Sequence, residues 1–170
     1  MNNPFKNKVF RRWFWSILIV IVVLLLLRVP TRLSVAVFNR NTDLPFGLLE
    51  KKTDFSEYEC LGGFGCMAYS LEDDNGTLYY QVSRWPDMLF GSKQTTRIYC
   101  TDPDFTIYGV SVGDHASDAE EILKHHGFLK WKDEYRRFGL SIEFYLDKKS
   151  QTITEIRVFV ESTSILPVIF

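Results

Sequence analysis

The sequence predicts an α+β fold that is mainly antiparallel sheet with one or two short helices, preceded by a single transmembrane helix. Three observations predict it. An uncharged apolar run, Trp13–Leu27, stands near the start of the chain. Asn75-Gly76 is a strong hairpin-turn signal, because this dipeptide readily adopts positive φ. In 140–146, Ile142, Phe144 and Leu146 alternate with more polar residues, which is typical of a half-buried strand.

The apolar run indicates a retained membrane anchor. Its fifteen residues span roughly 22 Å as a helix, against a hydrocarbon core of about 30 Å. Arg12 and Arg28 can close that gap by extending their charged ends into the interfaces, where Trp13 and Trp15 are also favoured. The predicted organisation is a basic cytoplasmic leader (1–12), a transmembrane signal anchor (13–27), a stalk (28–43) and an extracytoplasmic α+β domain (44–170).

The charges that flank the run predict its orientation. Four cations and no acid precede it, namely Lys6, Lys8, Arg11 and Arg12. This bias favours a single-pass plasma-membrane protein with a cytoplasmic amino terminus, whose anchor contacts membrane lipid.

A cleavable signal peptide is the alternative reading of the same run. Ser34-Val35-Ala36 offers small residues for cleavage near Ala36. Arg28, Pro30 and Arg32 lie between the apolar core and that position, where cations are unusual. The retained anchor is therefore preferred.

Composition limits the classes of partner. The formal net charge is −1 and acids outnumber bases from residue 41 onward, so no strong positive field is present to attract nucleic acid. Among the three cysteines, Cys60 and Cys66 are joined by a glycine-rich segment that can turn back on itself. In an oxidising compartment they would form a short-loop disulfide that leaves Cys100 unpaired. A pairing that involves Cys100, and three reduced, buried thiols, are the alternatives.

The carboxyl-terminal part carries the clearest local signals. A helix is predicted over Ser117–His126, because Ala119, Ile122 and Leu123 share one face and Gly127 provides a left-handed stop. Three strands are predicted after it, over 129–137, 140–146 and 153–161. The segments 78–100 and 140–159 also resemble each other in their order of strands and turns, which suggests a tandem repeat of 44–104 and 105–161.

A resemblance to a known group extends this prediction. Tyr108-Gly109-Val110-Ser111-Val112-Gly113-Asp114, followed by a short helix, Gly127 and three strands, resembles the helix-plus-meander module of the BamE/SmpA-like and beta-lactamase-inhibitor-protein-like bacterial envelope proteins. The resemblance covers about residues 105–161. It implies a binding or scaffold module that uses a sheet face or loops against other proteins. The chain lacks the acylated cysteine of the lipoprotein members.

Catalytic chemistry has no support in the sequence. His115 and Asp118 are one helical turn apart, but His125 lies nearly three turns away, so one helix cannot bring them to one ion. No nucleophile motif such as Gly-x-Ser-x-Gly is present. We expect no catalytic residues, no metal and no cofactor. Trp85 and Trp131 border polar segments and are the candidate interface residues, with core packing as the alternative.

The predicted function is therefore that of a membrane-anchored, extracytoplasmic, non-catalytic module of the cell envelope that binds or scaffolds another envelope protein. Two alternatives remain. One is a secreted inhibitor released by cleavage near Ala36. The other is a small ligand sensor or hydrolase whose site is assembled from scattered residues.

Overall fold

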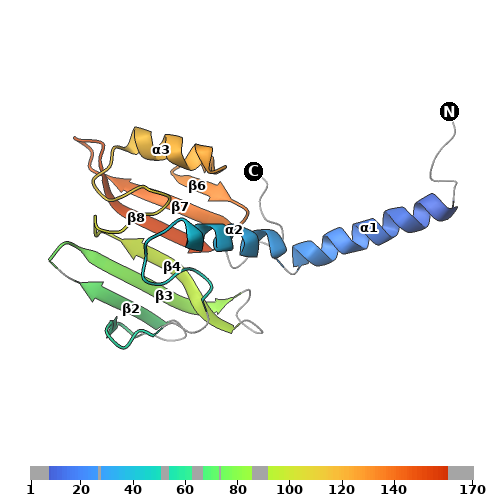
Figure 1. The fold of residues 1–170 in the computed structure, drawn as a ribbon, viewed down its shortest axis with the longest axis horizontal. Helices are drawn as coiled ribbons and strands as arrows, with labels where there is room; N and C mark the ends of the chain where they lie inside the picture. Colours follow the sequence, from blue (N-terminus) through green and yellow to red (C-terminus); the bar gives the residue numbers. More distant parts are fainter. Residues whose placement is uncertain are drawn as a thin grey trace.

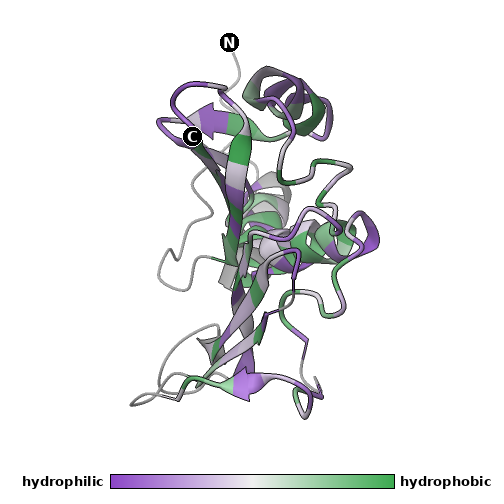
Figure 2. Cartoon of the chain, turned by 90° about the vertical axis from the view of Figure 1, so that its left-hand side faces the viewer, coloured by the Kyte–Doolittle hydropathy of each residue, from purple (hydrophilic) through white to green (hydrophobic). Residues whose placement is uncertain are grey.

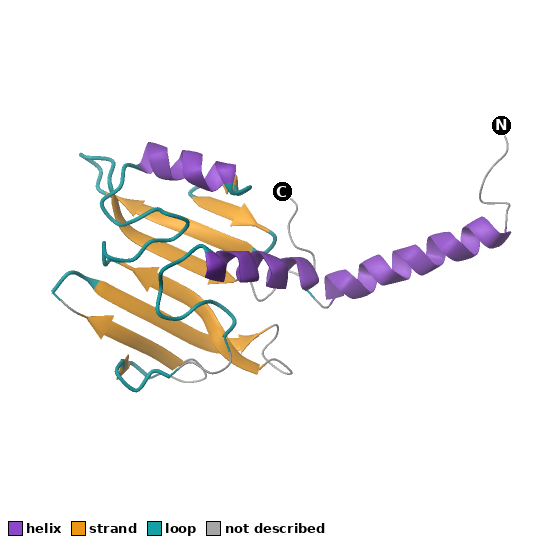
Figure 3. Cartoon of the chain, viewed as in Figure 1, coloured by secondary structure: helices purple, strands orange, loops and turns teal. Residues whose placement is uncertain are grey.

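One antiparallel sheet dominates the structure. The computed structural model describes residues 8–26, 28–50, 54–62, 67–72, 74–85 and 92–160. Within these residues the sheet has eight strands in the order β1-β2-β3-β4-β8-β7-β6-β5, and three helices accompany it (Figures 1 and 3). The elements in chain order are α1 (Lys8–Leu26), α2 (Val29–Arg40), β1 (Glu59–Cys60), β2 (Met67–Glu72), β3 (Thr77–Trp85), β4 (Ser92–Cys100), α3 (Ala116–His125), β5 (Leu129–Trp131), β6 (Glu134–Arg137), β7 (Leu140–Leu146) and β8 (Ile153–Val160).

The expectation of a preceding transmembrane helix was wrong. No helix within the described residues is both long enough and apolar enough to cross a bilayer. Helix α1 has 19 residues, but Lys8, Arg11 and Arg12 occupy its first turns, so the uncharged part spans only roughly 21 Å against about 30 Å of hydrocarbon. The single-pass plasma-membrane location, the signal anchor and the membrane class are corrected with it. Contact with membrane lipid stays a prediction.

Helix α2 (Val29–Arg40) occupies most of the segment 28–43, for which a stalk was expected. Proline often ends a helix, but Pro30 lies in the first turn of α2, where its missing N–H costs nothing. Arg28 adopts a left-handed conformation (φ 53°) that separates α1 from α2. The buried residues of α2 recur at helical spacing: Thr31, Ser34, Val35 and Phe38. Helix α2 therefore belongs to the α+β domain.

Helix α2 lies against the turn between β6 and β7. The Ser34 hydroxyl donates to the backbone carbonyl of Arg137 at 3.1 Å. Gly139 has φ 79°, and a Cβ on it would lie 2.8 Å from the Thr31 hydroxyl oxygen. Close approach of helix and turn therefore depends on a residue without a side chain at position 139.

Both α2 and α3 cover the same face of the sheet, which is seen edge-on in Figure 2. The residues below them form one register line across the central strands, in which Tyr80, Ile98, Val158 and Ile142 are successive partners. All four are fully buried. They belong to one hydrophobic core with Phe38 of α2 and with Ala119 and Leu123 of α3.

The order of elements has an internal symmetry. Helix α2 is followed by strands β1 to β4, and α3 by strands β5 to β8. The last strand of each set meets the other at the centre of the sheet, where Ile98 of β4 pairs with Val158 of β8. This arrangement gives each half one helix and four strands; a common origin of the two halves stays a prediction.

Candidate functional site

The face of the sheet opposite to α2 and α3 is covered by no helix or strand within the described residues, and we call it the open face. In an antiparallel sheet, the side chains of directly paired residues point to the same side. One line of paired residues across the strands, which we call the register line, therefore identifies residues of the open face. The line crosses all eight strands in the order Glu59, Ser70, Tyr79, Tyr99, Arg157, Glu143, Glu134 and Trp131.

Two tyrosines form a shallow hollow on one half of the open face. The rings of Tyr79 and Tyr99 meet edge to face, with centroids 5.1 Å apart. The hollow has a volume of about 410 Å³ and is lined by Thr77, Tyr79, Tyr99, Thr101 and Glu155. Aromatic rings at its floor and hydroxyl groups at its side offer apolar contact and hydrogen bonds to one ligand surface.

Arg157 lies beside this hollow and is fixed from several sides. Its Nε donates to Glu155 Oε1 at 2.6 Å, and its Nη1 donates to the Tyr145 hydroxyl at 2.8 Å. The guanidinium carbon lies 3.9 Å from the Tyr145 ring centroid and 5.2 Å from that of Tyr99. These contacts raise the pKa of Arg157, the hydrogen bond to Glu155 foremost. Arg157 therefore keeps its positive charge, and the aromatic neighbours hold its guanidinium in one orientation.

The other half of the open face carries acids and exposed apolar side chains. Leu129 and Trp131, on the edge strand β5, are 64% and 45% exposed. Trp131 pairs with Glu134, which in turn pairs with Glu143. Burial, and then the charge of the Glu134 carboxylate, raise the pKa of Glu143. We call Trp131, Glu134 and Glu143 the acidic end.

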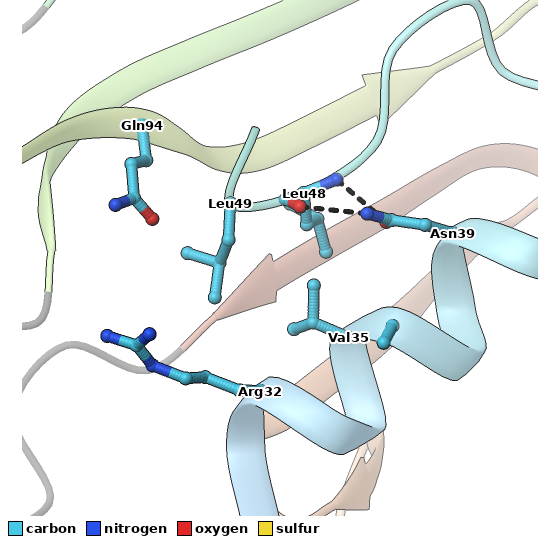
Figure 4. A pocket seen from close by; sticks show the side chains of 7 residues that line it. Arg32, Val35, Asn39, Leu48, Leu49 and Gln94 are labelled. Atoms are coloured by element: carbon cyan, nitrogen blue, oxygen red, sulfur yellow. Dashed lines mark hydrogen bonds between the residues drawn. The ribbon is translucent and has the colours of Figure 1, made fainter. Parts of the chain in front are cut away.

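A second hollow lies on the other side of the molecule, between α2 and the segment that follows it (Figure 4). It has a volume of about 250 Å³ and is lined by Arg32, Val35, Ala36, Asn39, Leu48, Leu49 and Gln94. The Asn39 amide donates to the Leu48 carbonyl at 3.0 Å, and its oxygen accepts from the Leu48 N–H at 2.9 Å. Asn39 thus joins the helix to the following loop, which is a structural role.

The structure describes the side chain of one of the two candidate interface tryptophans, Trp131. Trp131 lies on the open face with nearly half of its side chain exposed. Trp85 is the last residue of β3, and its side chain lies outside the described part of the chain. An interface role for either residue stays a prediction.

The cysteines are placed in contrasting environments. Cys60 is exposed on β1 and Cys100 is buried on β4. Burial raises the pKa of the Cys100 thiol to about 11, and its Sγ donates to the Asp102 carbonyl at 3.3 Å. A neutral thiol of this kind is a core residue and a poor nucleophile. Cys66 lies outside the described residues, so its disulfide with Cys60 remains a prediction.

The histidines and acids that were considered as metal ligands do not gather at one place in the described residues. Among the residues that the structure describes, no group of three or more His, Cys, Asp and Glu side chains lies close enough to hold a metal ion. His115 precedes α3 and His125 ends it, and the ring of His126 packs against Tyr108 with centroids 4.7 Å apart. These histidines therefore serve the ends of the helix and its packing.

Sequence analysis alone did not find Tyr79, Tyr99, Arg157, Glu134 or Glu143. The alternation of side chains along a strand shows only which residues of that one strand share a face. The sequence contains no signal for the pairing of β4 with β8, and this pairing brings the two halves of the line together.

Comparisons with known proteins add little. Neither a family model nor a curated protein matches the chain. Among solved structures it is similar to a cysteine-rich secretory protein from Staphylococcus aureus, with 15% identity and a TM-score of 0.39. The match covers 77% of this chain and 43% of that protein, so the chain corresponds to less than half of its length. The resemblance to the BamE/SmpA-like and inhibitor-protein-like group is not addressed by these comparisons and stays a prediction.

Proposed function

We propose that the chain is a non-catalytic module that binds another protein through the open face of its sheet. The observation that carries the proposal is the register line itself, which aligns tyrosine, arginine and tryptophan side chains on one uncovered surface. These three residue types are enriched where binding energy concentrates in protein interfaces. Their partial burial against the sheet limits the conformational entropy that is lost when a partner binds.

The arrangement of the sheet favours face binding over strand addition. The edge strands have only two and three residues, β1 and β5 respectively. An added strand needs a longer row of free backbone groups to gain affinity. The open face, in contrast, extends across all eight strands.

The alternative of a secreted inhibitor released near Ala36 receives less support. Ala36 lies inside α2, between the buried core residues Val35 and Phe38. Cleavage there would remove the first half of a helix that the core requires. The sensor or hydrolase alternative would use one of the two hollows. The hollow beside α2 is lined by no carboxylate, histidine or hydroxyl. In the hollow of Tyr79 and Tyr99, Glu155 accepts from Arg157 and the Thr101 hydroxyl accepts from the Thr77 N–H, so no nucleophile is hydrogen-bonded to a base there in the described residues.

Site-specific photocrosslinking tests the proposal. A benzoylphenylalanine placed at Tyr99 on the open face should capture a discrete protein partner in cells. The matched control carries it at Leu33 of α2, which is 62% exposed outside the open face. Equal capture at both positions, or capture at Leu33 alone, would contradict the proposal.

A further inference from the structure

We propose that the acidic end receives a lysine or arginine side chain from the protein partner, held between the Trp131 indole and the carboxylates of Glu134 and Glu143. The inference rests on the proposed function and specifies the chemistry of the partner. It predicts a basic residue in the part of the partner's contact surface that meets the edge of the sheet at β5, β6 and β7.

The carboxylates lack a full set of partners. Arg136 Nη2 donates to Glu134 Oε1 at 2.5 Å, whereas Glu134 Oε2 is buried with no hydrogen-bond partner among the described residues. The structure gives Glu143 no hydrogen bond or ion pair within the same residues. Arg136 thus neutralises Glu134 but not Glu143, which faces Glu134 with no ion-pair partner of its own among the described residues. Like charges directly opposite each other are unfavourable in a sheet, and a further cation beside Glu143 would relieve the repulsion.

A second, independent observation lies next to these acids. Ser141 is 1% exposed, and its hydroxyl has no hydrogen-bond partner within the described residues. It stands two residues before Glu143 on β7, on the same side of the sheet, and pairs with Arg136. A buried hydroxyl with no partner costs free energy, so it marks a position where an additional donor is favourable.

The charges around Glu143 are mixed. Burial and the charge of Glu134 raise the pKa of Glu143, Arg157 and Arg97 lower it, and Asp133 raises it. Arg136 is paired with Glu134, and Arg157 with Glu155. Within the described residues, Glu143 is therefore the carboxylate of the pair that has no ion-pair partner of its own.

Trp131 supplies the third part of the site. Its indole is 45% exposed and lies one strand away from Glu134 and two strands away from Glu143, a separation of about 10 Å. Tryptophan is the aromatic side chain that attracts a cation most strongly. A planar guanidinium also has five N–H donors, more than one carboxylate can accept.

Small-molecule titration of the full chain tests this inference. The probe is N-acetyl-argininamide, with N-acetyl-lysinamide as the second cation and N-acetyl-citrullinamide as the uncharged control, and the readout is the indole N–H resonance of Trp131. We expect a saturable shift with both cations and none with citrulline. Glu143→Gln should weaken binding about tenfold, whereas Glu121→Gln, an exposed acid on α3, should leave it unchanged.

The outcomes separate the two proposals. An equal shift with citrullinamide, no shift with either cation, or no effect of Glu143→Gln on the binding of either cation in a variant that is fully folded would overturn the cation site. Capture of a partner from Tyr99 would still support binding through the open face in that case. Loss of that capture would overturn the proposed function itself.

Discussion

Glu134 of β6 and Glu143 of β7 are direct cross-strand partners on the open face, two like charges held side by side. Burial and this neighbour raise the pKa of Glu143 from its ordinary value of 4.5. The charged form is thus less favourable in the folded chain than in the unfolded chain. The Arg136–Glu134 ion pair and the charges of Arg157 and Arg97 offset only part of this cost.

Glu143→Gln should stabilise the isolated chain at neutral pH. Removing one of two directly opposed like charges should raise the free energy of unfolding by about 0.2–1 kcal/mol. Because the pKa of Glu143 is higher in the folded chain than in the unfolded chain, this carboxyl group does not destabilise the wild type below pH 4.5. The free energy of unfolding then falls as pH rises through the raised pKa. Urea unfolding at pH 4 and pH 7 measures this; a gain that is equal at both pH values would argue against charge repulsion.

Glu120→Gln should have the opposite effect and pH dependence. Hydrogen bonds from Lys124, Lys130 and Tyr135 lower the pKa of Glu120 to about 2. Its contribution is therefore complete above the ordinary value near 4.5 and disappears as pH falls through about 2. Because the lysines are largely exposed, the loss at pH 7 should be only about 0.5–1 kcal/mol.

Chemical unfolding of Glu120→Gln at pH 7 and at pH 2 provides the comparison. Glu121→Gln, the adjacent exposed residue on α3, is the matched control and should change little. If both variants lose the same stability, the hydrogen-bonded network around Glu120 is not its cause.

Phe38→Ala tests whether α2 belongs to the domain. Phe38 is fully buried in the core, so its truncation should cost about 3–5 kcal/mol. Leu33→Ala, on the exposed side of the same helix, should change stability by less than about 0.5 kcal/mol. Similar melting temperatures for the two variants would restore the interpretation of residues 28–43 as a stalk.

Arg157→Lys tests the aromatic packing on the open face. Lysine keeps the charge but loses the planar contact with the Tyr145 ring and the directed bond to Glu155. We expect a loss of about 0.5–1 kcal/mol in the free energy of unfolding. Arg97→Lys, an exposed arginine on the same face, should be neutral; an equal loss in both would assign the effect to general surface charge.

Local patterns predicted much of the fold. The helix over Ser117–His126 is shifted by one residue from α3, and the strand predicted over 140–146 matches β7, since periodicity and Gly127 act within a few residues. Helix α2 was missed although its apolar positions have helical spacing, because Pro30 fits both a helix start and a helix stop. The prediction of a membrane helix was wrong because it gave the apolar composition of the run more weight than its short length and the charges of Arg11 and Arg12.

The candidate site was much harder to predict. Trp131 was chosen for its polar neighbours, and such a residue packs in a core as readily as it lies on a surface. Tyr99 and Glu143 come together only through the antiparallel pairs β4–β8 and β7–β8, which are contacts between residues far apart in the chain. Strand alternation defines two faces, but only the packing of α2 and α3 determines which of them is buried.

The affinity of a purified, crosslink-identified partner for wild type and Trp131→Ala tests the central claim most directly. Truncation of an interface tryptophan typically costs 2 kcal/mol or more, so we expect the Kd to rise by about 30-fold while the melting temperature stays unchanged. An unchanged Kd for both Trp131→Ala and Tyr99→Ala would contradict binding through the open face.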